Sequence, residues 1–318
     1  MKIFRTVDEI HLDQRTVVTV GSFDGFHLGH QQILKELNRQ AREDCDCLEI
    51  LITFHPHPKE VIGNPKDHPI EILTPLEEKL EVLRDLGLPA VLVIPFTREF
   101  SQTNYKDFVK NILVEKLRIK KMVVGHDHAF GKNREGHPAQ LKQLGSEFGF
   151  SVTVLDPFYL DGEIVSSSAI RNLLKKGDVS TAGKLLGRPY SLSGAVEKGD
   201  HRGRELGYPT ANLEIKNPHK LIPHKGVYAV DVEHQQKIYK GMMNIGNRPT
   251  FNFDPLTLEV HIFNFSGSIY GSELKVFFKK FIREEIKFEN AEALKKQMLS
   301  DKEICIKIRK IIIPDGDY

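Results

Sequence analysis

The stretch that most constrains the fold runs from Thr16 to His30, where an apolar run passes through glycines into a helical pattern. Residues 16–20, Thr-Val-Val-Thr-Val, are β-branched and apolar in the manner of a buried strand. Gly21 interrupts this run, and Asp24-Gly25 indicates a turn. Helical spacing then relates four apolar residues, which are Leu28, Ile33, Leu34 and Leu37. The segment therefore predicts a strand, a tight turn and a helix in direct succession.

Two histidines stand at the start of the predicted helix, where unpaired backbone N–H groups and the helix dipole attract phosphate. His27 and His30 are three residues apart, so their side chains share one face of the helix. Gly29 between them lets a bulky ligand approach the backbone. Two imidazoles beside a polyphosphate can stabilise the charge that develops as a phosphorus–oxygen bond breaks. The alternative is a strand–helix corner that carries two solvated histidines.

Apolar strands and helices alternate through the rest of the first half. Further strands are predicted at residues 47–54, 90–95, 121–125 and 152–155. Helices are predicted at residues 75–86, with Thr74 as N-cap and Pro75 at the first helical position, and at residues 106–117. This alternation indicates a parallel α/β sheet, in which ligands bind beyond the carboxyl ends of the strands.

The pattern of predicted elements changes near residue 187, from alternating strands and helices to short β-rich runs. This change suggests a domain of residues 1–186 followed by a domain of residues 187–318. Short β-rich runs separated by turn residues predict a small antiparallel barrel or sandwich, with strands at 191–197, 226–232, 238–245, 257–265 and 273–281. A final helix is expected at about residues 290–310, with Asn290 as its cap. Its core-facing residues are expected to be Leu294, Met298, Ile304 and Ile308.

The composition excludes several classes of protein. The 318 residues suit one or two globular domains, and a net charge of +2 gives no electrostatic case for nucleic acid or membrane partners. Three cysteines, an odd number, argue against a disulfide framework, and Cys305 is expected to be a small buried residue. The sequence shows neither a signal peptide nor an apolar run long enough to span a membrane. A reducing, cytoplasmic location is therefore expected.

The string Gly21-Ser-Phe-Asp-Gly-Phe-His-Leu-Gly-His30 resembles the signature of the HxGH nucleotidyltransferases, in its flavin branch. Four later stretches extend this resemblance over nearly the whole chain. They are Val165-Ser-Ser-Ser-Ala-Ile-Arg171, Leu186-Gly-Arg-Pro-Tyr190, Gly207-Tyr-Pro-Thr-Ala-Asn212 and Asn244-Ile-Gly-Asn-Arg-Pro-Thr-Phe251. Together they resemble the bacterial bifunctional riboflavin kinase/FMN adenylyltransferase (FAD synthetase) family. The resemblance implies an α/β N-terminal domain that is Rossmann-like, with a parallel sheet. It also implies an all-β C-terminal domain, a six-stranded antiparallel Greek-key barrel with a terminal helix.

The same resemblance implies two reactions. The C-terminal domain would phosphorylate riboflavin to FMN with ATP, and the N-terminal domain would adenylylate FMN to FAD and release pyrophosphate. Mg²⁺ is the implied cofactor, ATP the co-substrate, and the flavins the remaining small-molecule partners. The sequence leaves the oligomeric state open.

For adenylyl transfer the resemblance implies His27, His30 and Arg171 as catalytic residues. The implied ATP-binding residues are Gly21, Phe23, Asp24, Gly25, His27, His30, Ser167, Ser168 and Arg171. Serines before a helical run supply hydroxyl groups, and Arg171, three residues after Ser168, can face the same anion. Ser168 stands where many members of the family carry Thr, a change that keeps the hydroxyl.

For the flavin, the resemblance implies five binding residues, which are Phe54, His57, Pro58, Asp127 and Arg283. His128 departs from the family pattern, which carries an aromatic residue there, and this departure puts the local packing around the flavin in doubt. A metal site at His55 and His57 is an alternative, although alternate residues of a strand point to opposite faces and would chelate poorly.

For the kinase reaction, the resemblance implies an ATP and Mg²⁺ loop formed by Gly199, Arg202, Gly207, Pro209, Thr210 and Asn212. Thr210 and Asn212 offer a hydroxyl and a carbonyl oxygen to one hard cation, which suits Mg²⁺ held together with substrate phosphates. Glu259 is implied as the general base that accepts the proton of the riboflavin 5′-hydroxyl. It shares a strand face with His261, which receives no role, and a solvated strand face is the alternative.

Two rival functions are weaker. An HxGH domain can serve a pantetheine phosphate or a cytidylyl acceptor, but such proteins lack the half that carries Gly-x-Pro-Thr-Ala-Asn. A flavin or nucleotide sensor with an inactive site should have lost His30, Arg171 or Glu259, and all three are present.

Overall fold

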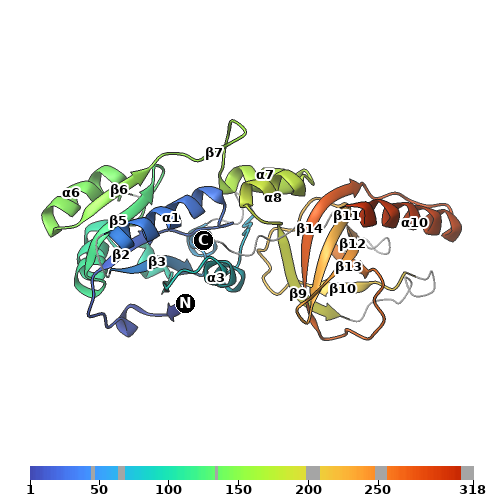
Figure 1. Cartoon of the computed structure of the whole chain (residues 1–318), viewed down its shortest axis with the longest axis horizontal. Helices are drawn as coiled ribbons and strands as arrows, with labels where there is room; N and C mark the ends of the chain where they lie inside the picture. The colour runs from blue at the N-terminus through green and yellow to red at the C-terminus, as the bar shows by residue number, and fades with distance from the viewer. Residues whose placement is uncertain (44–46, 64–68, 133–134, 198–207, 248–255, 309–318) are drawn as a thin grey trace. The chain divides into compact units, whose positions relative to one another are not determined.

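A computed structural model describes residues 1–43, 47–63, 69–132, 135–197, 208–247 and 256–308 (Figure 1). Within them the chain divides into two compact units, the first ending at Ser167 and the second beginning at Ser168. This division precedes the predicted boundary at residues 186/187, because helices α7 (Ser167–Lys175) and α8 (Val179–Leu186) pack on the second unit. Ser180 Oγ, for example, donates to the Lys279 carbonyl at 2.8 Å.

The first unit contains a six-stranded sheet in the order β1-β4-β3-β2-β5-β6, and every neighbouring pair is parallel. The strands are β1 (Lys2–Phe4), β2 (Thr16–Val20), β3 (Leu48–His55), β4 (Ala90–Pro95), β5 (Ile119–Gly125) and β6 (Ser151–Leu155). The five predicted strands are confirmed. Strand β1 was not predicted, because three residues are too short to show an alternating pattern.

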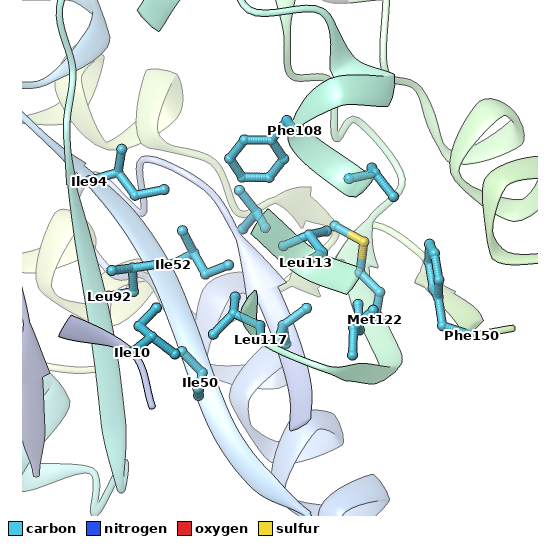
Figure 2. Close-up of a cluster of buried hydrophobic side chains, with 14 of the residues drawn as sticks. Ile10, Ile50, Ile52, Leu92, Ile94, Phe108, Leu113, Leu117, Met122 and Phe150 are labelled. Carbon is cyan, nitrogen blue, oxygen red and sulfur yellow. The ribbon is translucent and has the colours of Figure 1, made fainter. Parts of the chain in front are cut away.

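Helices cover both faces of this sheet. Helices α1 (Leu28–Glu43) and α3 (Leu76–Asp85) pack on one face, and α1 lies against β2, β3 and β5 (Figure 1). The other face carries α5 (Tyr105–Phe108), η2 (Val109–Lys116) and α6 (Pro138–Phe148), and Figure 2 shows its interior. Successive residues of a strand point into the cores on opposite faces of the sheet. Leu51 packs in the core beneath α1 and α3, and Ile50 and Ile52 pack in the core beneath α5, η2 and α6.

The start of α3 corrects one sequence prediction. The N-cap is Pro75, which makes no side-chain capping bond, and Thr74 is not the cap. The backbone N–H of Thr74 instead donates to Asp24 Oδ1 at 3.0 Å. The remaining short elements of this unit are η1 (Val7–Glu9), α2 (Pro58–Ile62), α4 (Arg98–Ser101), β7 (Tyr159–Leu160) and β8 (Glu163–Ile164).

The second unit contains a closed antiparallel barrel in the order β10-β13-β12-β11-β14-β9. Its strands are β9 (Ser191–Glu197), β10 (Ala211–Glu214), β11 (Gly226–His234), β12 (Lys237–Asn247), β13 (Leu256–Ile262) and β14 (Glu273–Arg283). The predicted strands are confirmed. Strand β10 was not predicted, because its four residues show no clear alternating pattern, and it closes the barrel between β9 and β13. The six-stranded barrel implied by the resemblance is therefore present.

Helix α10 (Ala291–Lys307) packs against β11 and β12 on the outside of the barrel (Figure 1). Asn290 caps it, as predicted, by accepting from the Ala293 N–H at 2.9 Å. Cys305 is buried, as predicted, and Met298 and Ile308 join its cluster. The prediction for Ile304 is wrong, since this residue is 40% exposed. The inward face follows residues 294, 298, 301, 305 and 308 at steps of four and three, and it therefore includes Asp301.

Candidate active sites

The loop between β2 and α1 is held in a conformation that most side chains avoid. Phe23, Gly25 and Phe26 have φ angles of 47°, 83° and 41°, all in the left-handed region. For non-glycine residues this conformation is costly and persists only where the surroundings enforce it. One such constraint is the hydrogen bond from Phe26 N to the Phe23 carbonyl at 3.3 Å. The loop that carries the predicted ATP site is therefore a fixed turn.

Asp24 fixes the middle of this loop from inside the protein. Its side chain accepts from the backbone N–H groups of Leu73 and Thr74, each at 3.0 Å, and only 3% of the residue is exposed. Its backbone carbonyl accepts from Ser167 Oγ at 2.8 Å. Two of the predicted ATP-binding residues, Asp24 and Ser167, are thus joined within the first unit, and the Asp24 carboxylate serves the loop itself.

His27 and His30 lie face to face at the start of α1, as their spacing predicts. Their ring centroids are 3.7 Å apart and the ring planes differ by 18°. The His30 backbone N–H donates to His27 Nδ1 at 3.4 Å, and the edge of Phe23 meets the His30 ring at 5.1 Å. Glycine at position 29 leaves the His27 ring undisturbed, because a Cβ there would lie only 3.2 Å from its ring atoms.

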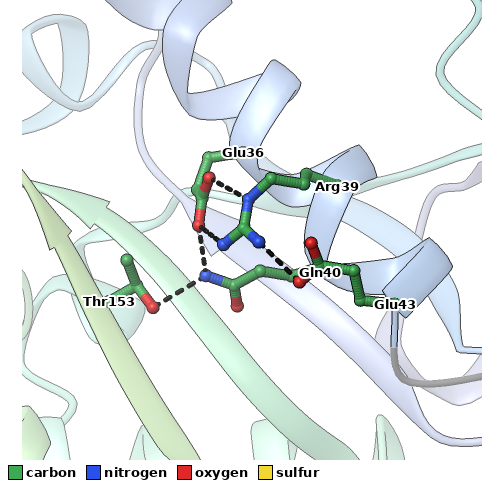
Figure 3. Close-up of polar contacts among 5 residues, drawn as sticks. All are labelled: Glu36, Arg39, Gln40, Glu43 and Thr153. Atoms are coloured by element: carbon green, nitrogen blue, oxygen red, sulfur yellow. Dashed lines mark hydrogen bonds and ion pairs between the residues drawn. The ribbon is translucent and has the colours of Figure 1, made fainter.

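The far end of α1 is anchored by a polar network, shown in Figure 3. Gln40 Nε2 donates to Thr153 Oγ1 of β6 and to Glu36, both at 2.7 Å. Arg39 bridges Glu36 and Glu43 on the same helix. The hydrogen bond from Arg39 contributes most to lowering the pKa of the Glu36 carboxyl. The helix that carries the histidine pair is therefore fastened to the sheet at its other end.

Lys79 of α3 is a charged residue that none of the sequence motifs includes. It occupies the apolar face of α3 beside Leu76 and Leu80, and 3% of it is exposed. Its Nζ donates to the Ser22 carbonyl at 2.5 Å and to Thr53 Oγ1 at 3.3 Å. Burial lowers the pKa of Lys79 to about 8. A lysine at an apolar helical position is the only signal that could have revealed it.

The predicted flavin residues of the first unit lie at the ends of β3 and β5. Phe54 meets Phe96 at 5.5 Å and Phe100 at 5.9 Å between ring centroids. His57 is buried and caps α2, since its Nδ1 accepts from the Lys59 N–H at 3.1 Å. Pro58 forms the first residue of α2. The role of His57 as the cap of α2 accounts for its Nδ1 without a metal ion.

A chain of ring contacts joins these residues to His128. It passes from Phe54 through Phe100, Phe108 and Phe130 to His128, with successive centroids 5.2–6.2 Å apart. The departure from the family pattern at His128 therefore keeps a ring in contact with Phe130. Asp127 is exposed, and its Oδ1 lies against Gly125, where a Cβ would be only 3.3 Å away. Phe96 and Phe100 were not identified from the sequence.

Ser168 and Arg171 lie in α7, in the part of that helix assigned to the second unit. Arg171 is buried, as are Ile170 and Leu174 on the same helix. Their predicted place beside the ATP phosphates of the first unit stays a prediction.

In the barrel, three polar residues occupy one row across three adjacent strands. Glu259 of β13 lies directly opposite Asn212 of β10 on one side and Asn244 of β12 on the other. Directly opposite residues in antiparallel strands have Cβ atoms about 4.5–5.5 Å apart. Leu258 and Val260 on either side of Glu259 are buried, and alternation along the strand turns them to the opposite face. The fold thus brings the predicted base beside the predicted metal ligand Asn212.

Asn244 extends this row to a second carboxylate. Its Nδ2 donates to Glu285 Oε1 at 3.3 Å, and the Glu285 carboxylate lies over Gly246, where a Cβ would collide with it. Asn244 belongs to a sequence motif that carries no predicted role for it, and Glu285 belongs to none of the motifs. The pairing of strands, which sequence does not display, places Asn244 opposite Glu259, and Asn244 in turn donates to Glu285.

His261 supports the segment that leads into β10. Its Nδ1 lies 2.8 Å from the Pro209 carbonyl, so that this nitrogen carries the proton and donates. Its ring also meets Tyr208 edge-on at 5.2 Å. Burial lowers the pKa of His261, so the imidazole is neutral at neutral pH. This contact holds the backbone one residue before Thr210. Gly199, Arg202 and Gly207, the other predicted loop residues, lie outside the described residues.

Arg283, a predicted flavin residue, uses its guanidinium within the protein. Nε lies 3.0 Å and Nη2 2.8 Å from Asp301 Oδ2 of α10, and Nη1 donates to the Glu284 carbonyl at 2.9 Å. These contacts tie β14 to α10. A role for Arg283 in binding flavin stays a prediction.

Across the residues that the structure describes, no group of three or more histidine, cysteine, aspartate or glutamate side chains is arranged to hold a metal ion. In the same residues, no helix is long and apolar enough to cross a membrane.

Comparisons with known proteins bear on both units. A family model described as FAD synthetase matches residues 9–169, and one described as riboflavin kinase matches residues 186–309. Curated relatives described as bifunctional riboflavin kinase/FMN adenylyltransferase match nearly the full length. One from Buchnera aphidicola is 37% identical over 98% of this chain and 100% of its own. One from Escherichia coli is 36% identical over 95% of this chain and 96% of its own.

A solved structure shares the whole fold. It is described as a macrolide-efflux protein from Streptococcus pneumoniae and is 31% identical, with a TM-score of 0.87. The match covers 96% of this chain and 99% of that one. Its description belongs to that protein, whereas both family models and the curated relatives describe flavin enzymes.

Proposed function

Because the chain belongs to the bifunctional riboflavin kinase/FMN adenylyltransferase family, we propose how its own residues divide between the two reactions. Members phosphorylate riboflavin to FMN and transfer an adenylyl group from ATP to FMN. The stack of His27 and His30 above a fixed loop carries the assignment for adenylyl transfer. The row Asn212, Glu259 and Asn244 carries the assignment for the kinase.

In the first unit, the FMN phosphate attacks the α-phosphorus of ATP, the bond to the β-phosphate oxygen breaks, and pyrophosphate leaves. No covalent bond to the protein is needed, so positioning and charge stabilisation supply the rate. His27 and His30 stabilise the charge on the phosphates, and the N–H groups at the start of α1 hold them. Ser167, Ser168 and Arg171 are proposed to bind the ATP phosphates, together with Gly21, Phe23 and Gly25 of the loop.

The flavin end of FMN is proposed to lie against Phe54, His57, Pro58 and Asp127. Supporting this proposal, the chain of rings from Phe54 to His128 offers aromatic surface at the carboxyl ends of the strands. Offset or edge-to-face contacts with a flat ring system are worth about 0.5–1.5 kcal/mol each beyond burial.

In the second unit, Glu259 is proposed to accept the proton of the riboflavin 5′-hydroxyl as its oxygen bonds to the γ-phosphorus of ATP and ADP leaves. Mg²⁺ is proposed to bind Thr210 and Asn212. A hydroxyl and an amide oxygen suit this hard cation, which commonly takes few protein ligands beside phosphates and water. When bound, the cation would neutralise phosphate charge. Asn244 lies opposite Glu259 on the side away from Asn212, and it is proposed to orient the Glu259 carboxylate.

We also propose that the kinase function requires residues 187–318 and the adenylyltransferase function residues 1–186, with ATP and the flavins as the small-molecule partners. A cytoplasmic location is proposed on the basis that Cys47 and Cys305 are free thiols.

The test measures both activities on one preparation of each variant. His30→Ala should lower FAD formation from FMN by about 10²–10³-fold, the effect of a lost transition-state donor, and leave FMN formation unchanged. His137→Ala, at an exposed histidine of the same unit, is the control and should change neither activity. Near-normal FAD synthesis by a folded His30→Ala protein would overturn the assignment.

Glu259→Gln keeps the shape of the side chain and removes the proton acceptor. We expect it to lower riboflavin phosphorylation by about 10²–10⁴-fold while FMN is still converted to FAD. Glu214→Gln, at an exposed glutamate of neighbouring β10, is the matched control. Wild-type kinase turnover in Glu259→Gln would leave only the solvated strand face as the explanation of Glu259.

A further inference from the structure

Lys79 is a buried charge to which the proposed reactions assign no role. Lysine is almost never enclosed unless it is paired, and removing an ammonium group from water carries a large free-energy cost. An apolar residue would complete the buried face that Leu76, Leu80 and Leu83 form on α3. A lysine at this position therefore needs a compensating function.

The ammonium group of Lys79 joins the histidine-bearing loop to the end of β3. Its Nζ donates to the carbonyl of Ser22, the residue that enters the left-handed turn at Phe23. It also donates to Thr53 Oγ1, which in turn donates to the Ser22 carbonyl at 3.3 Å. The three groups form a closed set of hydrogen bonds beneath the loop.

Two carboxylates face this ammonium group from different elements. Asp24 of the loop and Glu60 of α2 both raise the pKa of Lys79 and oppose the larger effect of burial, which lowers it to about 8. Asp24 is itself bonded to the backbone of Leu73 and Thr74, and Glu60 accepts from the His57 N–H at 2.7 Å. Through these two carboxylates, the charge on Lys79 acts both on the segment at Leu73 and Thr74 and on α2.

We propose that Lys79 is a positioning residue for adenylyl transfer, whose buried ammonium group holds the loop of residues 21–27 so that His27 and His30 meet the phosphates of ATP. The inference rests on the proposed function of the first unit. Lys79 touches no reacting atom. It acts through the Ser22 carbonyl and the Asp24 carboxylate, which set the path of the loop into α1.

The variant Lys79→Met keeps most of the side-chain volume and removes the charge. We expect FAD formation from FMN to fall by about 10²-fold, the size of effect that a small misplacement of reacting groups can cause. FMN formation from riboflavin on the same preparation should be unchanged. The melting temperature of the first unit should change only modestly, because relief of the cost of burying a charge offsets the loss of the hydrogen bonds to Ser22 and Thr53. Lys142→Met, at an exposed lysine of α6, is the matched control.

A pH profile separates positioning from a purely structural role. In the wild type, FAD formation should decline as the pH rises above about 8, because Lys79 then loses its proton. In Lys79→Met this alkaline decline should be absent, and the rate should be low throughout. An alkaline limb that is identical in both proteins would overturn the proposal, as would FAD formation by Lys79→Met within about threefold of the wild type.

If Lys79→Met fails to fold, Lys79→Ala with added ethylammonium decides the question. Recovery of FAD formation with ethylammonium, and not with ethanol, supports the need for a positive charge at this position. Absence of recovery in a folded Lys79→Ala protein overturns it. A wild-type protein that forms no FAD would overturn the proposed function of the first unit, whereas an active wild type with an equally active Lys79→Met would overturn only the role of Lys79.

Discussion

The ion pair between Arg283 and Asp301 should control the stability of the barrel unit. The side chains are 18% and 2% exposed, and Asp301 also accepts from Gln297 Nε2 at 2.9 Å. Asp301→Ala leaves the guanidinium without its counter-charge. Removing one partner of a fully buried pair costs about 3–5 kcal/mol. Since Arg283 keeps some contact with water, we expect a loss of about 2–4 kcal/mol from the free energy of unfolding.

The second unit provides its own readout of this loss, the heat inactivation of riboflavin phosphorylation. For a unit of this size, each kcal/mol shifts the melting temperature by about 2–4 °C, so Asp301→Ala should lower the inactivation temperature by about 4–16 °C. Most residues proposed for FMN adenylylation belong to the other unit, so the inactivation temperature of this activity should fall less than that of the kinase. Glu303→Ala, at an exposed residue of the same helix, is the matched control.

The double variant Arg283→Met/Asp301→Leu replaces the pair with apolar side chains of similar size. Such replacements of buried ion pairs are often neutral or stabilising, so this variant should recover most of the lost stability. The reasoning would be refuted by an Asp301→Ala protein that inactivates at the wild-type temperature. It would equally be refuted by a double variant less stable than Asp301→Ala.

Three further predictions concern other parts of the chain. Gly29→Ala should push its Cβ against the His27 ring and lower FAD formation by about tenfold with normal FMN formation, and unaltered FAD formation would show that the stack tolerates the displacement. A fragment of residues 187–318 should phosphorylate riboflavin and form no FAD. A fragment of residues 168–318, which keeps most of α7 and all of α8, should retain its kinase activity to a higher temperature. If the shorter fragment is folded but inactive, the kinase site needs residues before position 187. The pKa of His261 is lowered in the folded state, so the stability that depends on its neutral form is present above its ordinary pKa of 6.5 and is lost as the pH falls through the lower folded value. The rate of heat inactivation of the kinase should therefore rise as the pH falls below 6.5 in the wild type, and rise less in His261→Gln. The same pH dependence of this rate in both proteins would contradict the prediction.

Sequence periodicity identified the described strands of five or more residues and helices α1, α3 and α10, because it reports which side of each element is buried, but helix α6 was not predicted. Strands β2 and β4 agree with the structure at both ends, and so does β9. The short strands β1 and β10 had too few residues for a period and are defined by their neighbours. On α10, an apolar residue at position 304 suggested an inward face, but the helix turns Asp301 inward to meet Arg283. Long-range pairing of this kind leaves no local pattern.

The residues of the candidate sites fall into two groups, those that a motif identifies and those that only long-range contacts identify. Motifs identified His27, His30, Asn212 and Glu259, and the fold shows which of them are neighbours. Lys79 escaped notice because its role depends on a carbonyl 57 residues away in the sequence. Asn244 and Glu285 likewise gain their positions from strand pairing and from the return of the chain after β14. Residues that act through another residue have no spacing that sequence alone can reveal.

The central claim is that one chain carries two separate active sites, one for each reaction, and a mixing experiment tests it most directly. His30→Ala and Glu259→Gln are each incubated alone with riboflavin, ATP and Mg²⁺, and then together at the same total concentration. Each variant alone should form little FAD, because one of its two reactions is blocked. The mixture should form FAD at a rate within a few-fold of the wild type, because FMN made by His30→Ala is adenylylated by Glu259→Gln. A mixture as inactive as either variant alone, with FMN accumulating in solution, would contradict the account.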